Sequence, residues 1–145
     1  QQSFQYQYTF NSGMYNSLLK EFRFSIGEQY ELNEFNLKAL ESTFSNGLEN
    51  ENYEYIKGDF RTLFGVSFCS NPILQYNGDI LSRIVYSFDI KDLGKLQEKL
   101  SDYLLITDKF DLGQTFTVFS FPEFSLMLDI EKDIKLRVFK ILGQT

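Results

Sequence analysis

The chain begins with strictly alternating aromatic and polar residues, a pattern that is typical of a half-buried strand. This run is FQYQYTF, residues 4–10. One face of the predicted strand carries Phe4, Tyr6, Tyr8 and Phe10, and the other carries Gln5, Gln7 and Thr9. The Asn-Ser-Gly sequence at 11–13 ends the strand, and apolar residues of 14–22 then recur at helical spacing. Residues 22–27 fit either a continuation of that helix or a short strand.

The middle of the chain predicts a second helix from about Asn33, because three apolar residues share one helical face. These residues are Leu37, Leu40 and Phe44. Gly47 stands where a C-terminal helix cap belongs, and the polar residues 45–52 indicate a loop. A short strand is predicted at 53–56.

A further strand is predicted at 59–68, with Gly65 marking a β-bulge. Residues 70–79 contain the turn signals Asn-Pro and Asn-Gly, which predict a loop or the connection of a hairpin.

The clearest unit is SRIVYSFDIKDLGKLQEKLSDYLL, residues 82–105, which predicts a strand leading directly into a helix. Asp89 is suited to cap that helix. The strand face is Ile84, Tyr86 and Phe88, and the helix stripe is Leu93, Leu96, Leu100 and Leu104. Packing a helix on a sheet requires these two apolar faces, so we interpret the unit as scaffold and not as a site.

The end of the chain predicts three strands, at 115–121, 124–130 and 134–142. Pairing the last two as a hairpin opposes Ile130 with Ile134, Leu128 with Leu136, and Leu126 with Val138. Lys135 and Arg137 then share the outer, solvated face with Asp129. The predicted fold is α+β in two layers, a mainly antiparallel sheet of five to seven strands with about three helices packed on one face. The length suits a single domain over residues 1–145.

Composition narrows the choice of partner. The chain is 43% hydrophobic and 17% aromatic, which is enough to build one core, and its net charge is −6. An acidic chain repels nucleic acid and anionic lipid surfaces but permits a basic protein partner. No apolar run approaches the roughly 18 residues that a membrane span requires, so we expect no membrane insertion.

The sequence offers little catalytic chemistry. The chain has no histidine, which excludes His-dependent triads and most catalytic zinc sites. Cys69, without a base to activate it, is interpreted as a buried or incidental thiol. The clustered carboxylates fall in predicted loops and turns and are interpreted as solvated: Glu49, Glu51, Glu54, Asp108, Asp111, Glu131 and Asp133. TDKFDLG, residues 107–113, lacks the ligand spacing of an EF-hand, and no phosphate-binding glycine motif occurs. We therefore predict no enzyme, no cofactor and no metal site.

The function that the sequence favours is a small interaction domain that binds a protein partner or copies of itself. Its N-terminal strand is uncharged and lacks the Lys, Pro or bulge that usually protects a sheet edge from other strands. Such a strand is suited to pair with an edge of another chain. The predicted contact residues are Phe4, Gln5, Tyr6, Gln7 and Tyr8.

The acidic charge also favours an alternative, an intracellular inhibitor or immunity-type protein that covers a basic site through the acids at 45–54 and 107–111. Residue 1 is Gln and not Met, as expected either of a trimmed chain or of one whose leader was removed in maturation. We expect the second case and a secreted or periplasmic location, with a cytoplasmic one as the alternative.

Overall fold

The computed structural model describes residues 3–7, 12–104, 116–121 and 123–140, and it describes side chains for 16–102, 121 and 123–140. The helices are α1 (Ser12–Glu21), α2 (Leu93–Leu104) and the short 3-10 helices η1 (Tyr30–Leu32), η2 (Glu34–Asn36) and η3 (Ile90–Asp92). The strands are β1 (Ser3–Gln7), β2 (Leu37–Ala39), β3 (Thr43–Ser45), β4 (Leu48–Tyr55), β5 (Thr62–Leu63), β6 (Val66–Asn77), β7 (Ile80–Phe88), β8 (Phe116–Ser120), β9 (Ser125–Ile130) and β10 (Ile134–Phe139).

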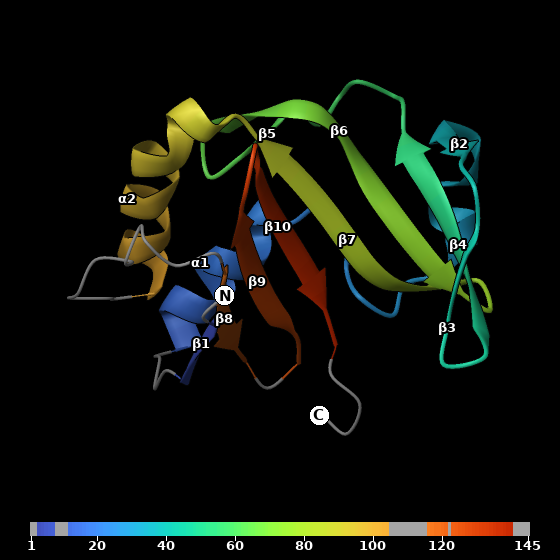
Figure 1. Ribbon diagram of the computed structural model, residues 1–145, viewed down its shortest axis with the longest axis horizontal. Helices are drawn as coiled ribbons and strands as arrows, with labels where there is room; N and C mark the ends of the chain where they lie inside the picture. Colours follow the sequence, from blue (N-terminus) through green and yellow to red (C-terminus); the bar gives the residue numbers. More distant parts are fainter. Residues whose placement is uncertain (1–2, 8–11, 105–115, 122, 141–145) are drawn as a thin grey trace.

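The strands form one twisted sheet in the order β1-β8-β9-β10-β7-β6-β4-β2, with β3 paired to β4 and β5 to β6 (Figure 1). The pairing of β1 with β8 is parallel, and the other pairings are antiparallel. The fold is therefore α+β with a mainly antiparallel sheet, as predicted. The numbers of elements were wrong, because the described residues contain ten strands and two α-helices.

The C-terminal hairpin is confirmed. β9 and β10 pair with Ile130 opposite Ile134, and the other predicted apolar pairs follow in the same register. On the outer face, the Arg137 guanidinium lies 3.2 Å from the Asp129 carboxylate. Alternating apolar positions fix this register, since a slip of one residue would expose the whole apolar set.

The predicted strand and helix at 82–105 are also confirmed, as β7 and α2. The Asp89 carboxylate accepts a hydrogen bond of 2.9 Å from the Lys91 N–H, which caps η3 one turn before α2 begins. Leu96 and Leu100 of α2 are fully buried in the same core cluster as Leu18 of α1. Both helices thus contribute to one core cluster with the strands, and Figure 1 shows them near the β1 end of the sheet.

The predicted helix from Asn33 and the predicted loop at 45–52 are both wrong, because β2, β3 and most of β4 occupy these residues. Asn46 and Gly47 have positive φ angles of 52° and 76°, which suit the two-residue turn of a tight hairpin. The glycine that was assigned to a helix cap therefore closes the β3–β4 hairpin. Turn chemistry and strand pairing here outweigh the apolar spacing on which the helix prediction rested.

The predicted loop at 70–79 is wrong for most of its length, because β6 runs through it as far as Asn77. The register between β6 and β7 shifts twice between Phe68 and Ile73, and the buried Pro72 lies within the second shift, between Ser70 and Ile73. Such irregularities let a strand pass a proline, which has no N–H to give to the ladder.

Two further tight turns join strands β5 to β7. Phe64 and Gly65 have positive φ angles and connect β5 to β6, so the bulge predicted at Gly65 is a hairpin turn. Gly78 and Asp79 likewise connect β6 to β7, which confirms the hairpin connection predicted within 70–79.

The segment 22–30, whose first residues the sequence left open, runs from α1 to the start of β7. The Gly27 N–H donates to the Leu81 carbonyl at 2.8 Å, and the Leu81 N–H returns a bond of 2.9 Å to the Glu28 carbonyl. Phe24 is buried with its ring centroid 4.9 Å from that of Tyr55. This anchored segment places η1 and η2 at the β2 end of the sheet (Figure 1).

Candidate protein-interaction surface

The predicted contact strand lies at one end of the sheet. Phe4, Gln5, Tyr6 and Gln7 belong to β1, which pairs with β8 from Ser3 to Gln7. Tyr8 lies outside the described residues. Among the described strands none pairs with the other side of β1, so this edge presents backbone groups to which another strand can bind.

The opposite end of the sheet is formed by β2 and β3, which both pair with β4. The Leu40 N–H donates to the Asn52 carbonyl at 2.8 Å, and Thr43 lies opposite Asn50. Two residues of the edge therefore oppose a single residue of β4, which is the arrangement of a β-bulge. A bulged edge is a poor template for adding a strand.

Asn52 fixes this bulge in place. Its side-chain amide donates to the Glu41 carbonyl at 3.0 Å and to the Thr43 hydroxyl at 3.2 Å, and its carbonyl oxygen accepts from Gln75 at 2.9 Å. Asn50 makes a similar link by donating to the Ser45 hydroxyl at 2.9 Å. These side-chain hydrogen bonds hold the backbone of the bulge in one conformation.

Most of the exposed large apolar side chains gather at this second end. Eight described residues of this kind are exposed, and six of them fall between residues 32 and 56: Leu32, Phe35, Leu40, Phe44, Leu48 and Ile56. Phe35 on η2 is 92% exposed and Phe44 on β3 is 74% exposed. Sequence reasoning missed both, since it left Phe35 aside and placed Phe44 on the apolar face of a helix.

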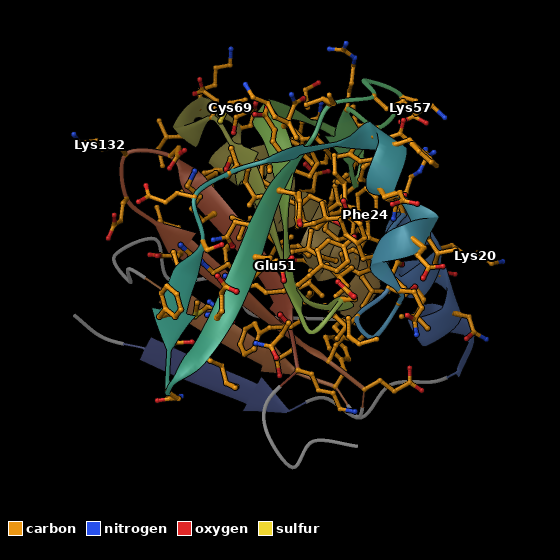
Figure 2. The ribbon with its side chains drawn as sticks, turned by 90° about the vertical axis from the view of Figure 1, so that its right-hand side faces the viewer. Lys20, Phe24, Glu51, Lys57, Cys69 and Lys132 are labelled. Atoms are coloured by element: carbon orange, nitrogen blue, oxygen red, sulfur yellow. The ribbon has the colours of Figure 1, made fainter. Side chains whose placement is uncertain are left out.

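The same end of the molecule carries the chain's excess of negative charge. Residues 28–56 hold seven of the 20 acidic residues and one of the 14 basic residues, so this segment has a net charge of −6, equal to that of the whole chain. We call residues 28–56 the acidic edge. Figure 2 looks onto it, with Glu51 on β4 and Phe24 in the interior behind.

The carboxylates of the acidic edge have no cationic partners among the described residues, whose ion pairs all lie elsewhere. Glu51 accepts a hydrogen bond from Tyr53 at 3.0 Å, and Glu54 accepts one from Asn71 at 2.8 Å. The acids predicted to be solvated in a loop at 45–54 therefore stand on a strand and its hairpin.

A polar cluster around Asp59 anchors the C-terminal end of β4, the last strand of the acidic edge. The Tyr55 hydroxyl donates to Asp59 at 2.7 Å and the Arg23 guanidinium at 2.6 Å. These two donors hold the pKa of the Asp59 carboxyl below its usual value. Burial, together with the hydrogen bond to Asp59, raises the pKa of Tyr55 to about 12. The cluster ties the end of β4 to the segment 22–30.

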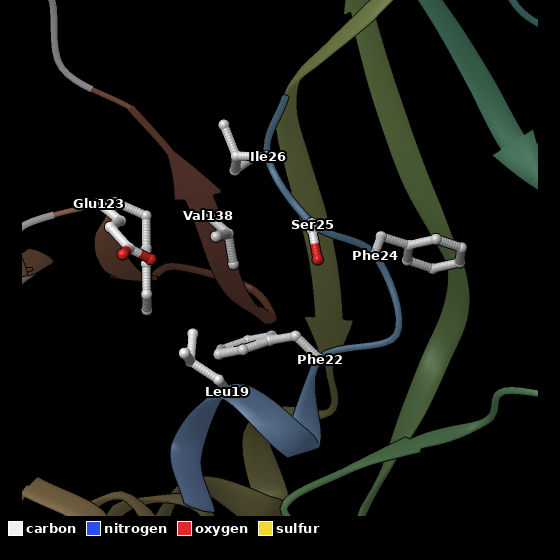
Figure 3. A pocket seen from close by; sticks show the side chains of 8 residues that line it. Leu19, Phe22, Phe24, Ser25, Ile26, Glu123 and Val138 are labelled. Atoms are coloured by element: carbon white, nitrogen blue, oxygen red, sulfur yellow. The ribbon is translucent and has the colours of Figure 1, made fainter. Parts of the chain in front are cut away.

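One cavity lies beside the end of α1 and has a volume of about 190 Å³ (Figure 3). Its lining is Leu19, Phe22, Phe24, Ser25, Ile26, Glu123, Phe124 and Val138. It is smaller than the roughly 300–1,000 Å³ of most small-molecule sites, and among the described residues that line it only Glu123 is titratable. We interpret it as a gap in the packing.

Cys69 was interpreted as a buried or an incidental thiol; it is exposed, so the first of these alternatives is wrong. It lines an open hollow of about 320 Å³ together with Glu54, Phe60, Arg61, Phe68, Ser70 and Asn71. Glu54 there is bonded to Asn71, and the Arg61 guanidinium donates to the Gly58 carbonyl at 2.9 Å. The hydrogen bonds of Glu54 and Arg61 thus go to Asn71 and to backbone, whereas an activated nucleophile is hydrogen-bonded to its base.

The remaining candidate chemistry is limited. Asp108, Asp111 and the stretch 107–113 lie outside the described residues. Within the described part, no three His, Cys, Asp or Glu side chains gather closely enough to hold a metal ion. No described helix has both the length and the apolarity that a membrane crossing requires. Comparison with known proteins gives no significant match to a family model, a curated protein or a solved structure.

Proposed function

We propose that this chain is a non-catalytic protein-binding domain that engages its partner through the acidic edge. The observation that carries the proposal is the exposure of Phe35 and Phe44 on one end of a hydrogen-bonded sheet. Leaving apolar surface in water costs about 25 cal/mol per Å². Neighbouring exposed apolar side chains rimmed by polar residues mark surfaces that another molecule covers.

The exposed side chains form two clusters along the acidic edge. Leu32, Phe35 and Ile56 lie at one end, where the Ile56 N–H donates to the Asn36 carbonyl at 2.9 Å. Phe44 and Leu48 lie at the other, in the β3–β4 hairpin. The length of β4 separates the two by about 26 Å. A standard interface of about 800 Å² on each partner can span that distance.

The alternative predicted from the sequence, an inhibitor or immunity-type protein that covers a basic site, shares the acids at 45–54 with this surface, and its other acids at 107–111 lie outside the described residues. Strand addition through β1 is a second mode of binding, favoured by the position of β1 at the end of the sheet. The two modes differ in what they need, because strand addition depends on backbone groups and binding at the acidic edge depends on side chains.

The test uses two variants at the acidic edge, Phe35→Ser and Phe44→Ser, with Ile90→Ser as the control. Ile90 on η3 is also an exposed apolar residue but lies in the strand-to-helix unit. Tagged wild-type and variant chains are used to capture proteins from the native organism, followed by identification by mass spectrometry. The proposal expects a protein held by the wild type and by Ile90→Ser, whose affinity falls by about 2 kcal/mol in either Phe variant, as for an interface hot spot.

Unfolding curves of the three variants should match the wild type, because exposed side chains contribute little to stability. A partner that both Phe variants retain at full affinity, and that a proline in β1 releases, would move the function to β1 and contradict the proposal.

A further inference from the structure

We infer that the partner of the acidic edge is a different protein that presents a cationic, apolar segment, and not a second copy of this chain. The inference rests on the proposed function and names the chemistry of the partner. It follows from the location of the charge, from the carboxylates beside the exposed phenylalanines, and from the balance of charge on the rest of the molecule.

Self-association through this edge is opposed by charge. Two copies meeting edge to edge would bring together two segments that each carry −6. Like charges facing across an interface cost free energy and slow association. The rest of the chain holds 13 acidic and 13 basic residues and is neutral overall, so it offers no net positive charge to the acidic edge of another copy.

The carboxylates stand beside the exposed apolar residues. Glu31 and Glu34 flank Leu32 and Phe35 along η1 and η2. At the hairpin, Glu49 lies directly opposite Phe44 in the pairing of β3 with β4. The same two features therefore recur at both ends of the edge, an aromatic ring and a carboxylate that has no cationic partner in the described part of the chain.

Lysine and arginine side chains fit this pairing of groups. Their aliphatic stems can lie along an aromatic ring while the charged end reaches a neighbouring carboxylate. A segment that alternates basic and apolar residues would satisfy both features along the edge. The one basic residue of the acidic edge, Lys38, lies opposite Glu54 in the strand pairing, so its place is on β2 and not on η2 or in the β3–β4 hairpin.

The test measures binding of labelled synthetic peptides by fluorescence anisotropy at low and high NaCl concentration. The main probe alternates Lys and Val. Three matched probes replace Lys with Gln, Lys with Glu, or Val with Ser. The inference expects the Lys-Val peptide to bind about tenfold more tightly than each of the others at low salt, and its affinity to fall steeply as salt screens the charges.

Two sets of substitutions locate the attraction. Glu31→Gln, Glu41→Gln and Glu49→Gln together neutralise exposed carboxylates of the acidic edge. Glu98→Gln, Asp102→Asn and Glu131→Gln make the same change of charge at exposed positions elsewhere. The first set should lower the affinity for the Lys-Val peptide about tenfold and reduce the dependence of that affinity on salt. The second set should change the affinity by less than about twofold.

The possible outcomes distinguish a failure of this inference from a failure of the proposed function. If both sets of substitutions lower the affinity for the Lys-Val peptide equally, the peptide is attracted by the charge of the whole chain and not by the acidic edge, which would overturn the inference. Equal binding of the Gln-Val peptide, lost in Phe35→Ser, would overturn the inference while leaving the proposed function standing. A dimer in sedimentation that Phe35→Ser abolishes would identify a second copy as the partner and overturn it as well. Failure of Phe35→Ser and Phe44→Ser to affect any binding would instead remove the proposed function.

Discussion

β1 and the acidic edge stand at opposite ends of one sheet and offer a partner different groups. β1 contains no charged residue, pairs regularly with β8 over five residues, and leaves its outer backbone unpaired among the described strands. The acidic edge is broken by a bulge that Asn52 fixes, and it displays phenylalanines among carboxylates.

This difference teaches how one sheet can separate two kinds of recognition. Backbone pairing tolerates many sequences and depends little on salt, because the hydrogen-bonding groups are the same in every strand. Recognition by side chains and charge is selective and depends on salt. The bulge and the charge protect the acidic edge from unspecific strand pairing, whereas β1 has no such protection.

The largest effect is expected from Ile84→Ala in β7, the strand that links the two ends. Ile84 is fully buried and lies opposite Val138 on one side and Leu74 on the other. Loss of its buried methyl groups should lower the free energy of unfolding by about 2–5 kcal/mol, measured by urea denaturation. Val85→Ala, on the outer face of the same strand, is the control and should cost less than about 1.5 kcal/mol.

Hydrogen exchange of the Ile84→Ala variant then sharpens the comparison. If the sheet is one cooperative unit, the amides of β4 and β10 lose protection together. Loss of protection on one side of β7 alone would show that the two ends unfold separately.

The next effect concerns β1 alone. Gln5→Pro removes a backbone donor and should abolish any complex formed by strand addition, while capture through the acidic edge continues. Gln7→Pro should act in the same way, and Gln5→Thr, which keeps the N–H and favours a strand, is the control. Sedimentation and capture assays report the two edges separately. A strand-pairing complex that persists in both proline variants would show that β1 is not its contact.

The smallest effect is expected from raising the pH, which tests the Asp59 cluster at the end of β4. The pKa of Tyr55 is raised from 10.0 to about 12, so the folded protein keeps this proton when the unfolded chain has lost it. The stability that Tyr55 contributes is therefore present below about pH 10 and is lost between about pH 10 and 12. The difference in absorbance at the tyrosinate band between wild type and Tyr55→Phe should titrate near pH 12. A midpoint near 10 would contradict both the burial of Tyr55 and its hydrogen bond to Asp59.

The parts of the fold that the sequence predicts well are those in which one face of each element is buried. β9 and β10 alternate because their even-numbered residues enter the core, and α2 shows a stripe because Leu96 and Leu100 do the same. In such elements the position of an apolar residue reports burial, so both the element and its register can be predicted.

At the acidic edge this relation fails. Phe44 is apolar but exposed, so its helical spacing from Leu37 and Leu40 carries no information about a core. The signal that was available is Asn46-Gly47, a strong indicator of a tight hairpin. In β6, the polar residues around Pro72 resemble a loop because the strand is irregular there.

The sequence pattern did not predict the candidate surface for a similar reason. The net charge of −6 describes the whole chain, although residues 28–56 account for all of it. The acids at 45–54 were placed in a loop, where carboxylates are ordinarily solvated and carry no particular meaning. The β3–β4 hairpin brings Glu49 opposite Phe44, so the pairing follows from the Asn46-Gly47 turn once that turn is recognised.

The most direct test of the account is an NMR titration of the whole chain with the Lys-Val peptide, followed through backbone amide chemical shifts. The account predicts that shifts concentrate at residues 31–56, around Phe35 and Phe44, and that the amides of β1 stay unchanged. Shifts centred on β1, or spread evenly over the surface, would contradict it.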